Sequence, residues 1–159
     1  MIFMIIENRQ ELSKKIQSLK KEGKKIVFTN GCFDILHVGH VTYLSKAKSL
    51  GDILIVGINS DSSVKKLKGA ARPINDLASR MVVLDSLKSV DLVVPFEDDN
   101  PISLIELIKP DIHVKGGDYK EDQLVESKVV KTNGGKVVII PFVNGYSVTT
   151  LLGKIKSKS

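Results

Sequence analysis

The chain has little of what nucleic-acid binders and secreted proteins usually carry. Its 159 residues contain no tryptophan, and aromatic residues make up only 5% of them. Because unpaired bases are commonly recognised by stacking on aromatic rings, this composition disfavours a nucleic-acid partner. Cys32 is the only cysteine, so no disulfide can form within the chain. A single thiol fits a reducing compartment, and we expect Cys32 to be a small residue at a tight turn rather than a nucleophile.

We also expect no membrane-spanning or export segment. The apolar stretch Met1–Ile6 is far too short to cross a bilayer, and it lacks the basic region and the small-residue cleavage site of a signal peptide. We therefore expect a cytoplasmic protein with no membrane partner. The same stretch is a candidate for docking against a second copy of the chain.

Three well-defined site motifs are absent as well. The sequence has no Gly-x-Gly-x-x-Gly after its first apolar run, no Gly-x-x-x-x-Gly-Lys-Ser/Thr and no Gly-x-Ser-x-Gly. These absences disfavour a dinucleotide dehydrogenase, a P-loop enzyme and a hydrolase with a nucleophile elbow. A metal site is not predicted either, because His37 and His40 lack a third ligand and His113 belongs to a different strand, where we expect a structural role.

What is present suits one globular α/β domain covering residues 1–159, with residues 1–25 forming a helical segment packed on it. Apolar residues make up 42% of the chain and charged residues 26%, and the net charge of +6 suits either a solvated surface or the steering of anionic substrates. The hydrophobic periodicity predicts strands over 26–29, 52–58, 91–95, 111–115 and 136–141, and helices over 7–22, 38–50, 62–67, 76–87, 102–108, 121–133 and 147–156.

Alternation of strands and helices predicts a doubly wound, five-stranded parallel sheet with helices on both faces. In such sheets ligands bind beyond the carboxyl ends of the strands. Four polar segments fall at such ends, at 30–40, 59–61, 115–118 and 142–147. Their coincidence predicts one site built from four loops.

The segment after the first strand carries the most informative pattern, His37-Val38-Gly39-His40. It opens a helix, and a helix N-terminus attracts phosphate through its free N–H groups and partial positive charge. The two histidines lie three residues apart and therefore share one face. Gly39 has no Cβ, which lets a ligand approach the backbone. The pattern suits a nucleoside triphosphate lying across the helix start.

These residues resemble the His-x-Gly-His signature of the cytidylyltransferase-like nucleotidyltransferases, which have a Rossmann-like fold. Within that superfamily the chain is similar to the D-glycero-β-D-manno-heptose 1-phosphate adenylyltransferases, or ADP-heptose synthases. The segments that carry this similarity are 30–40, 47–52, 57–61, 68–75, 89–91, 96–101, 114–119 and 145–147. In some organisms the domain follows a sugar kinase. We expect this chain to be the stand-alone form without the kinase.

The resemblance implies transfer of AMP from ATP to the sugar 1-phosphate, with release of pyrophosphate, for lipopolysaccharide core or another heptose-containing glycan. The implied catalytic residues are His37, His40, Arg80 and Lys115. The implied nucleotide-binding residues are Thr29, Asn30, Gly31, Cys32, Phe33, Gly39, Asp61, Lys68, Arg72, Tyr146, Ser147 and Thr149. The implied sugar-phosphate residues are Asp34, Lys115, Gly116 and Asp118, with Asp34 alternatively a cap of the histidine helix. Mg²⁺ is expected to arrive bound to ATP, and a homodimer is expected from relatives of this type.

The chain departs from the family pattern in two places. Phe142-Val143 stands where related cytidylyltransferases have Arg-Thr, and Val148 stands where a threonine is expected. Three hypotheses therefore remain open. The first is the heptose adenylyltransferase. The second is a relative that uses CTP with glycerol 3-phosphate or a phosphorylated amino alcohol, or that adenylates FMN, and the third is a nucleotide-binding module without catalysis. The sequence favours the first, because the catalytic set and the 114–119 loop are intact.

Overall fold

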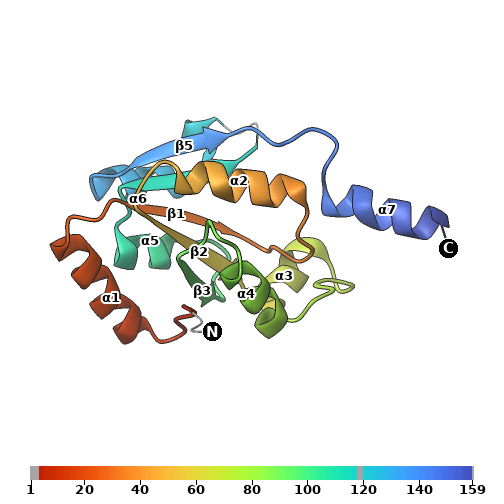
Figure 1. Ribbon diagram of the computed structural model, residues 1–159, viewed down its shortest axis with the longest axis horizontal. Coiled ribbons are helices and arrows are strands. Elements are labelled where there is room, and N and C mark those ends of the chain that lie inside the picture. The colour runs from red at the N-terminus through yellow and green to blue at the C-terminus, as the bar shows by residue number, and fades with distance from the viewer. Residues whose placement is uncertain (1–3, 118–119, 159) are drawn as a thin grey trace.

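The computed structural model describes residues 4–117 and 120–158, and its centre is a parallel five-stranded sheet (Figure 1). The strands lie in the order β3-β2-β1-β4-β5. They are β1 (Ile26–Gly31), β2 (Ile53–Asn59), β3 (Leu92–Phe96), β4 (Ile112–Gly116) and β5 (Lys136–Ile140). The predicted fold class is confirmed. Strand order reverses at the β1–β4 pair, where Phe28 is in register with His113, so the ligand crevice of this sheet type opens beyond these two strands.

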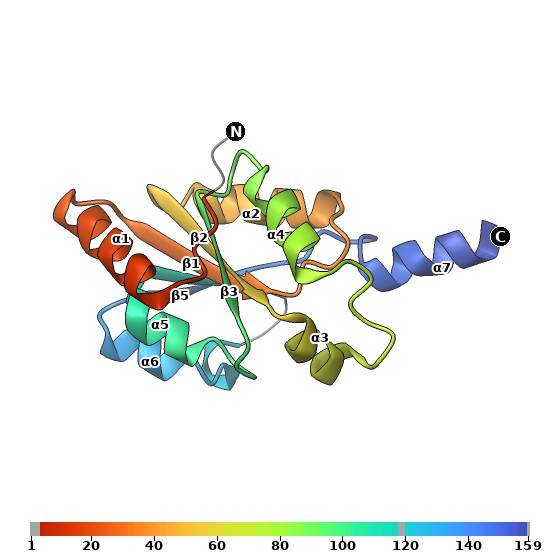
Figure 2. The same cartoon turned by 90° about the horizontal axis from the view of Figure 1, so that it is seen from below.

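Helices cover both faces of the sheet (Figures 1 and 2). The helices of the described chain are α1 (Arg9–Lys21), α2 (Val38–Lys48), α3 (Asp61–Lys68), α4 (Leu77–Asp85), α5 (Ile102–Ile108), α6 (Ser127–Thr132) and α7 (Val148–Lys158), together with a 3₁₀ turn η1 (Glu121–Gln123), and all but α7 lie against the body of the protein. Leucines and isoleucines of α1 and α5 pack with Val130 of α6 on one face, and α2 and α4 pack on the other.

Alternation along the strands divides the core between these two layers. In β1, Ile26 and Phe28 belong to the cluster under α1 and α5, whereas Val27 between them belongs to the cluster under α2 and α4. All three side chains are fully buried. Burial on both faces explains why the strands appear in the sequence as continuous apolar runs.

The described part of the apolar N-terminal stretch pairs with the sheet of its own chain. Ile5 forms a parallel bridge with Val93, the Ile6 N–H donates to the Val93 carbonyl at 3.0 Å, and the Val93 N–H donates to the Met4 carbonyl at 3.0 Å. This pairing covers the outer edge of β3. Met4–Ile6 therefore have an intramolecular partner, and the expected homodimer stays a prediction.

One predicted helix is divided into two parts in the structure. The sequence predicted a single helix over 121–133, but the structure has η1, a break, and then the short α6. Leu124 is extended, with φ −90° and ψ 118°, which places its side chain in the interior and interrupts the helical hydrogen bonds. The break also turns Glu126 inward.

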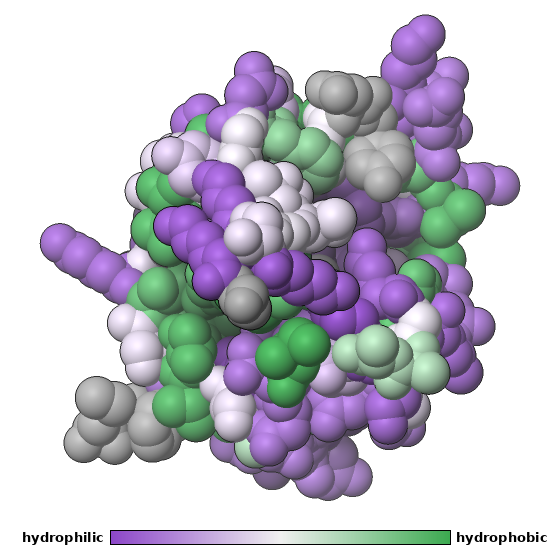
Figure 3. Space-filling model, turned by 90° about the vertical axis from the view of Figure 1, so that its right-hand side faces the viewer, coloured by the Kyte–Doolittle hydropathy of each residue, from purple (hydrophilic) through white to green (hydrophobic). Residues whose placement is uncertain are grey.

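The last helix, α7, projects from the body of the protein (Figures 1 and 2). Every one of its residues keeps part of its surface exposed. Figure 3 views the side from which α7 projects, where hydrophilic residues cover much of the surface. Among the described residues, no helix combines the length and the apolar character that crossing a membrane requires.

Candidate active site

The start of α2 is built by its two histidines. His37 is the N-cap residue, and its Nδ1 accepts the Gly39 N–H at 3.1 Å. In return, the His37 N–H donates to Nδ1 of His40 at 3.4 Å, and the ring centroids lie 3.9 Å apart. The cap is thus His37, and the alternative role of Asp34 as a cap of this helix is wrong. Because each Nδ1 accepts a hydrogen bond, the network assigns the proton of each neutral ring to Nε2, where it can be donated to a ligand.

Both histidines are neutral at pH 7 in the free protein. Burial, with a smaller contribution from His37, lowers the pKa of His40 to about 4. Burial also lowers the pKa of His37. A bound triphosphate brings negative charge to this site and raises both pKa values again. The two histidines are therefore neutral without a ligand, and binding of an anion favours their protonated, positively charged forms.

Gly39 leaves room for the His37 ring. A Cβ at this position would lie 2.9 Å from both Cε1 and Nδ1 of His37 and 3.3 Å from the Tyr146 Cβ. The ring of Tyr146 also stacks on His37, with centroids 6.4 Å apart and 26° between the planes. The loop after β5 thus reaches the helix start, as the sequence predicted from strand ends. The absence of a side chain at Gly39 therefore makes room for the His37 ring, in addition to the expected approach of a ligand.

The loop after β1 turns sharply between Asn30 and Asp34. Phe33 has a φ of 45°, and the edge of its ring meets His40 at a centroid distance of 5.5 Å. Cys32 lies near Asn59, and burial raises the pKa of its thiol. A raised pKa keeps Cys32 protonated at neutral pH, as expected of a turn residue rather than a nucleophile.

Thr29 stabilises the scaffold through its side chain. It is fully buried, and its hydroxyl lies 2.6 Å from the Tyr43 hydroxyl and 2.9 Å from the Val114 carbonyl. Tyr43 also donates to Val114, at 3.1 Å. This network ties α2 to β1 and β4. The side chain of Thr29 is therefore not presented to a nucleotide, and sequence reasoning missed Tyr43 because a tyrosine on a helix carries no sign of its partners.

Asp34 anchors the segment that follows α3. Its carboxylate is 4% exposed and accepts from Arg72 Nε at 2.6 Å and from the N–H groups of Ile74 and Asn75 at 2.9 Å. Burial alone would raise the pKa of Asp34, but these donors lower it. Both expected ligand residues, Asp34 and Arg72, are thus engaged with each other in this structure.

Arg80 lies inside the protein, only 2% exposed. Its guanidinium donates to the Cys32 carbonyl at 2.6 Å, to Asp61 Oδ1 at 2.8 Å and to the Asn75 carbonyl at 3.0 Å. It therefore supports the loop after β1 from beneath. Contact with a β- or γ-phosphate requires Arg80 to leave these partners, so the structure places it as a support rather than as an open phosphate ligand.

Lys115 stands at the carboxyl end of β4, beside β1. Its Nζ lies 2.9 Å from Glu126 Oε1 and 3.5 Å from Asn30 Oδ1. Gly116 follows it, and a Cβ there would meet Phe142 at 3.1 Å and Tyr43 at 3.2 Å. The structure thus brings Lys115, Asn30 and Gly116 together at the β1–β4 crevice. Asp118 lies outside the described residues.

The remaining predicted residues lie at the rim. Lys68 ends α3 and is exposed, and its charge acts to lower the pKa of Cys32. Ser147 accepts the Thr150 N–H at 3.0 Å, and Thr149 is exposed. A side chain at Gly31 would also be too close to its neighbour, because a Cβ there would lie 3.0 Å from the Phe33 ring.

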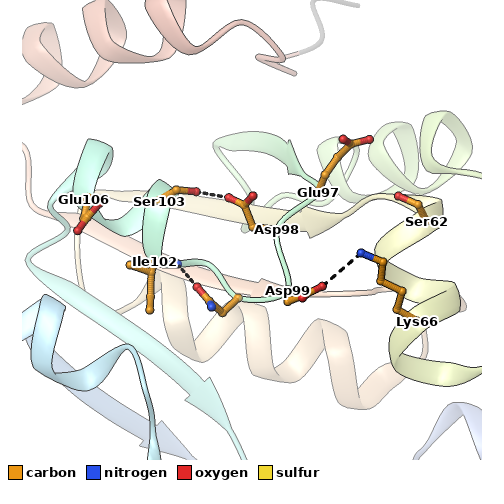
Figure 4. Close-up of a pocket in the computed structure, with 9 residues that line it drawn as sticks. Ser62, Lys66, Glu97, Asp98, Asp99, Ile102, Ser103 and Glu106 are labelled. Atoms are coloured by element: carbon orange, nitrogen blue, oxygen red, sulfur yellow. Dashed lines mark hydrogen bonds and ion pairs between the residues drawn. The ribbon is translucent and has the colours of Figure 1, made fainter.

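A separate hollow of about 660 Å³ lies between α3 and α5 (Figure 4). Its lining includes Glu97, Asp98, Asp99 and Glu106, and Lys66 lies 3.6 Å from Asp99 across it. The excess of carboxylates repels phosphate. The hollow therefore differs in charge from the histidine site. Despite its volume, we do not expect it to bind a nucleotide.

Residues 28–149 match the cytidylyltransferase-like family. The chain belongs to this family. A solved structure described as the lipopolysaccharide core biosynthesis protein from Thermoplasma volcanium is 33% identical, with a TM-score of 0.63, and covers 79% of this chain and 100% of its own. Pantoate-beta-alanine ligase from Francisella tularensis is 21% identical with a TM-score of 0.61, covering 88% of this chain and 67% of its own, and shows the shared fold.

Curated family members align with nearly the whole chain. The bifunctional protein HldE of Histophilus somni is 55% identical over 154 residues, and that of Salmonella arizonae is 51% identical over 154 residues, each covering 97% of this chain. The chain spans 32% of the length of these relatives. Membership of the family expected from the His-x-Gly-His signature is confirmed.

Proposed function

We propose that the chain transfers AMP from ATP to D-glycero-β-D-manno-heptose 1-phosphate, giving ADP-heptose and pyrophosphate. The observation that carries the reaction type is the reciprocal pairing of His37 and His40, which leaves two Nε2–H donors at a helix start. The choice of sugar rests on the resemblance of segments 72–75 and 114–119 to heptose enzymes. The similarity to proteins named bifunctional protein HldE and to a lipopolysaccharide core biosynthesis protein supports it.

The chemistry is an in-line displacement at phosphorus. An oxygen of the sugar phosphate forms a bond to the α-phosphorus of ATP, the bond from that phosphorus to the bridging oxygen breaks, and pyrophosphate leaves with the electron pair. The attacking oxygen is already anionic, so no strong base is needed and catalysis consists of positioning and charge stabilisation. In this proposal the Nε2–H groups of His37 and His40 donate to the leaving pyrophosphate.

Lys115 acts on the other side of the reaction. Its ammonium stands at the β1–β4 crevice, where it reduces the repulsion between the sugar phosphate and the α-phosphate. Asp34 and Arg72, which hold each other, keep the 72–75 segment beside the site. Lys68 at the rim adds positive charge for the triphosphate. Tyr146, stacked on His37, borders the nucleotide.

Mg²⁺ is proposed to bind through ATP. The donors around the helix start are imidazole, ammonium and backbone N–H groups, which suit phosphate oxygens rather than a divalent cation. Among the described residues, no group of three or more His, Cys, Asp or Glu side chains is placed to hold a metal ion. The ion would supply charge neutralisation on the triphosphate. The cytoplasmic location and the homodimer stay predictions.

The proposal is tested by pyrophosphate release in the presence of Mg²⁺, with ATP or CTP paired with heptose 1-phosphate or glycerol 3-phosphate. Turnover with ATP and heptose 1-phosphate alone is expected. Turnover with CTP and glycerol 3-phosphate would keep the triphosphate site and overturn the substrates. Binding of ATP without turnover in any pairing would support a non-catalytic module instead.

A further inference from the structure

Glu126 is a buried acid that the reaction described above does not use. It lies at the start of α6, directly after the break at Leu124, yet its side chain makes no capping hydrogen bond to that helix. It is 3% exposed and turns into the protein. There its Oε1 lies 2.9 Å from Lys115 Nζ and 3.4 Å from His113 Nε2.

His113 holds Glu126 from the sheet. Its ring is fully buried and stacks on Phe28 with centroids 5.6 Å apart. Burial lowers the pKa of His113, so the ring is neutral. Its Nδ1 is the one buried side-chain nitrogen or oxygen without a hydrogen-bond partner in the part of the chain that the structure describes. Because an ionised carboxylate can only accept a hydrogen bond, the contact with Glu126 assigns the proton of the neutral ring to Nε2.

Glu126 is consequently a fixed negative charge. Burial alone would raise its pKa, but the hydrogen bonds from His113 and Lys115, with the charge of Lys115, hold its pKa at about 2. It therefore stays ionised opposite Lys115 throughout the range in which the protein is expected to work. A partly buried ion pair of this kind adds little net stability, so its main effect is to fix the positions of the two charged groups.

The geometry also sets the direction of Lys115. A lysine ammonium has three N–H donors on a flexible four-carbon stem. Glu126 accepts one of them at 2.9 Å and Asn30 approaches a second at 3.5 Å. With two donors directed to fixed acceptors on different elements, the third is left for a ligand at the β1–β4 crevice.

We propose that Glu126 is a positioning residue, which holds the Lys115 ammonium in place for the transferring phosphate. This inference rests on the proposed function for the role of Lys115. A merely structural Glu126 would stabilise the fold without affecting the chemistry of Lys115 in particular. The two possibilities differ in whether the effect of removing Glu126 depends on the presence of Lys115.

A double-mutant cycle of Lys115→Ala and Glu126→Gln separates them. Because a displacement of about 1 Å in a catalytic group can cost about 100-fold in rate, E126Q is expected to lower kcat about 10- to 100-fold while KM for ATP stays within about twofold. In the K115A background, E126Q is expected to change kcat by less than about twofold. Independent, multiplicative losses, or a rise in KM for ATP with unchanged kcat, would overturn the proposal.

The chain supplies a matched control in Glu121. It forms an ion pair with Lys131 at 2.7 Å on the surface nearby. E121Q is expected to leave kcat and both KM values unchanged, since an exposed pair of this kind holds no group at the crevice. If circular dichroism shows that E126Q does not fold, E126D replaces it in the same cycle with the same expected non-additivity.

A measurement without substrate keeps this inference separate from the proposed function. The side-chain ¹⁵N resonance of Lys115, assigned by its loss in K115A, is expected to shift and become more mobile in E126Q but not in E121Q. An unchanged resonance would overturn the role of Glu126 even if heptose transfer is confirmed. Inactivity of the unmodified chain toward heptose 1-phosphate would refute the proposed function, while the resonance would still decide the role of Glu126.

Discussion

Substitution of Gly39 by alanine isolates the position of the His37 ring. The added Cβ would lie 2.9 Å from two atoms of that ring, which is shorter than the ordinary contact range of 3.4–4 Å. One of these atoms is Nδ1, which accepts the Gly39 N–H at 3.1 Å, so the ring cannot move away without weakening its own cap hydrogen bond. Tyr146, 3.3 Å from the same Cβ, restricts movement toward the loop after β5.

The size of the effect follows from these distances. Relieving the overlap moves the ring by roughly 0.5 to 1 Å, and a shift of that order in a catalytic group can lower kcat about 100-fold. Stability should change little. Alanine is favoured over glycine in a helix by about 0.5–1 kcal/mol. The weakened cap hydrogen bond costs up to about 1 kcal/mol, so the two effects on the free energy of unfolding nearly cancel.

The assay is pyrophosphate release from ATP and heptose 1-phosphate, with thermal unfolding followed by circular dichroism. Gly153 in α7 provides the matched control, because a Cβ there would meet no atom within 4 Å. G153A is expected to keep full activity and gain a little stability. If G39A retained kcat within twofold of the unmodified protein, the role assigned to the His37 ring would be wrong.

Three further predictions follow from the same site. His40→Ala should lower kcat about 100-fold or more, because a preorganised donor to the leaving group is lost, and near-normal kcat would contradict this role. Since the pKa of His40 is about 4 in the folded protein and 6.5 in the unfolded chain, the unfolded chain binds more protons as pH falls from 6.5 to 4. The melting temperature should therefore fall as the pH is lowered over this range, and it should fall less steeply in His40→Asn. The same pH dependence of the melting temperature in both proteins would refute the lowered pKa of His40. Arg80→Met should cost about 2–3 kcal/mol in urea unfolding, because it removes the donor of the Cys32 and Asn75 carbonyls, whereas a loss below about 1 kcal/mol would show that these contacts matter little.

The sequence was sufficient for the sheet and for the loops that meet at its edge. Buried parallel strands have distinctive apolar runs, and parallel connections bring their carboxyl ends to one side of the sheet. For this reason the amino-acid sequence alone predicts that the histidine helix and Lys115 share one site. The motif at His37 further identified the family.

The hydrogen-bond partners of individual polar side chains could not be predicted from the sequence. Asp34 and Arg80 both suggested ligand contacts, but each is buried and engaged with loop backbone, a consequence of turns that only the folded chain displays. Glu126 was hidden inside a predicted helix. Its role depends on the helix break at Leu124, for which no glycine or proline gives a signal.

Transfer of AMP is tested most directly by identifying the products formed from ATP and heptose 1-phosphate, by anion exchange and mass spectrometry. Attack on the α-phosphorus predicts ADP-heptose and pyrophosphate in equal amounts, with both reduced about 100-fold or more in His40→Ala. Formation of ADP with a bisphosphorylated sugar would exclude attack on the α-phosphorus, and equal product yields from the unmodified protein and His40→Ala would exclude the role of His40.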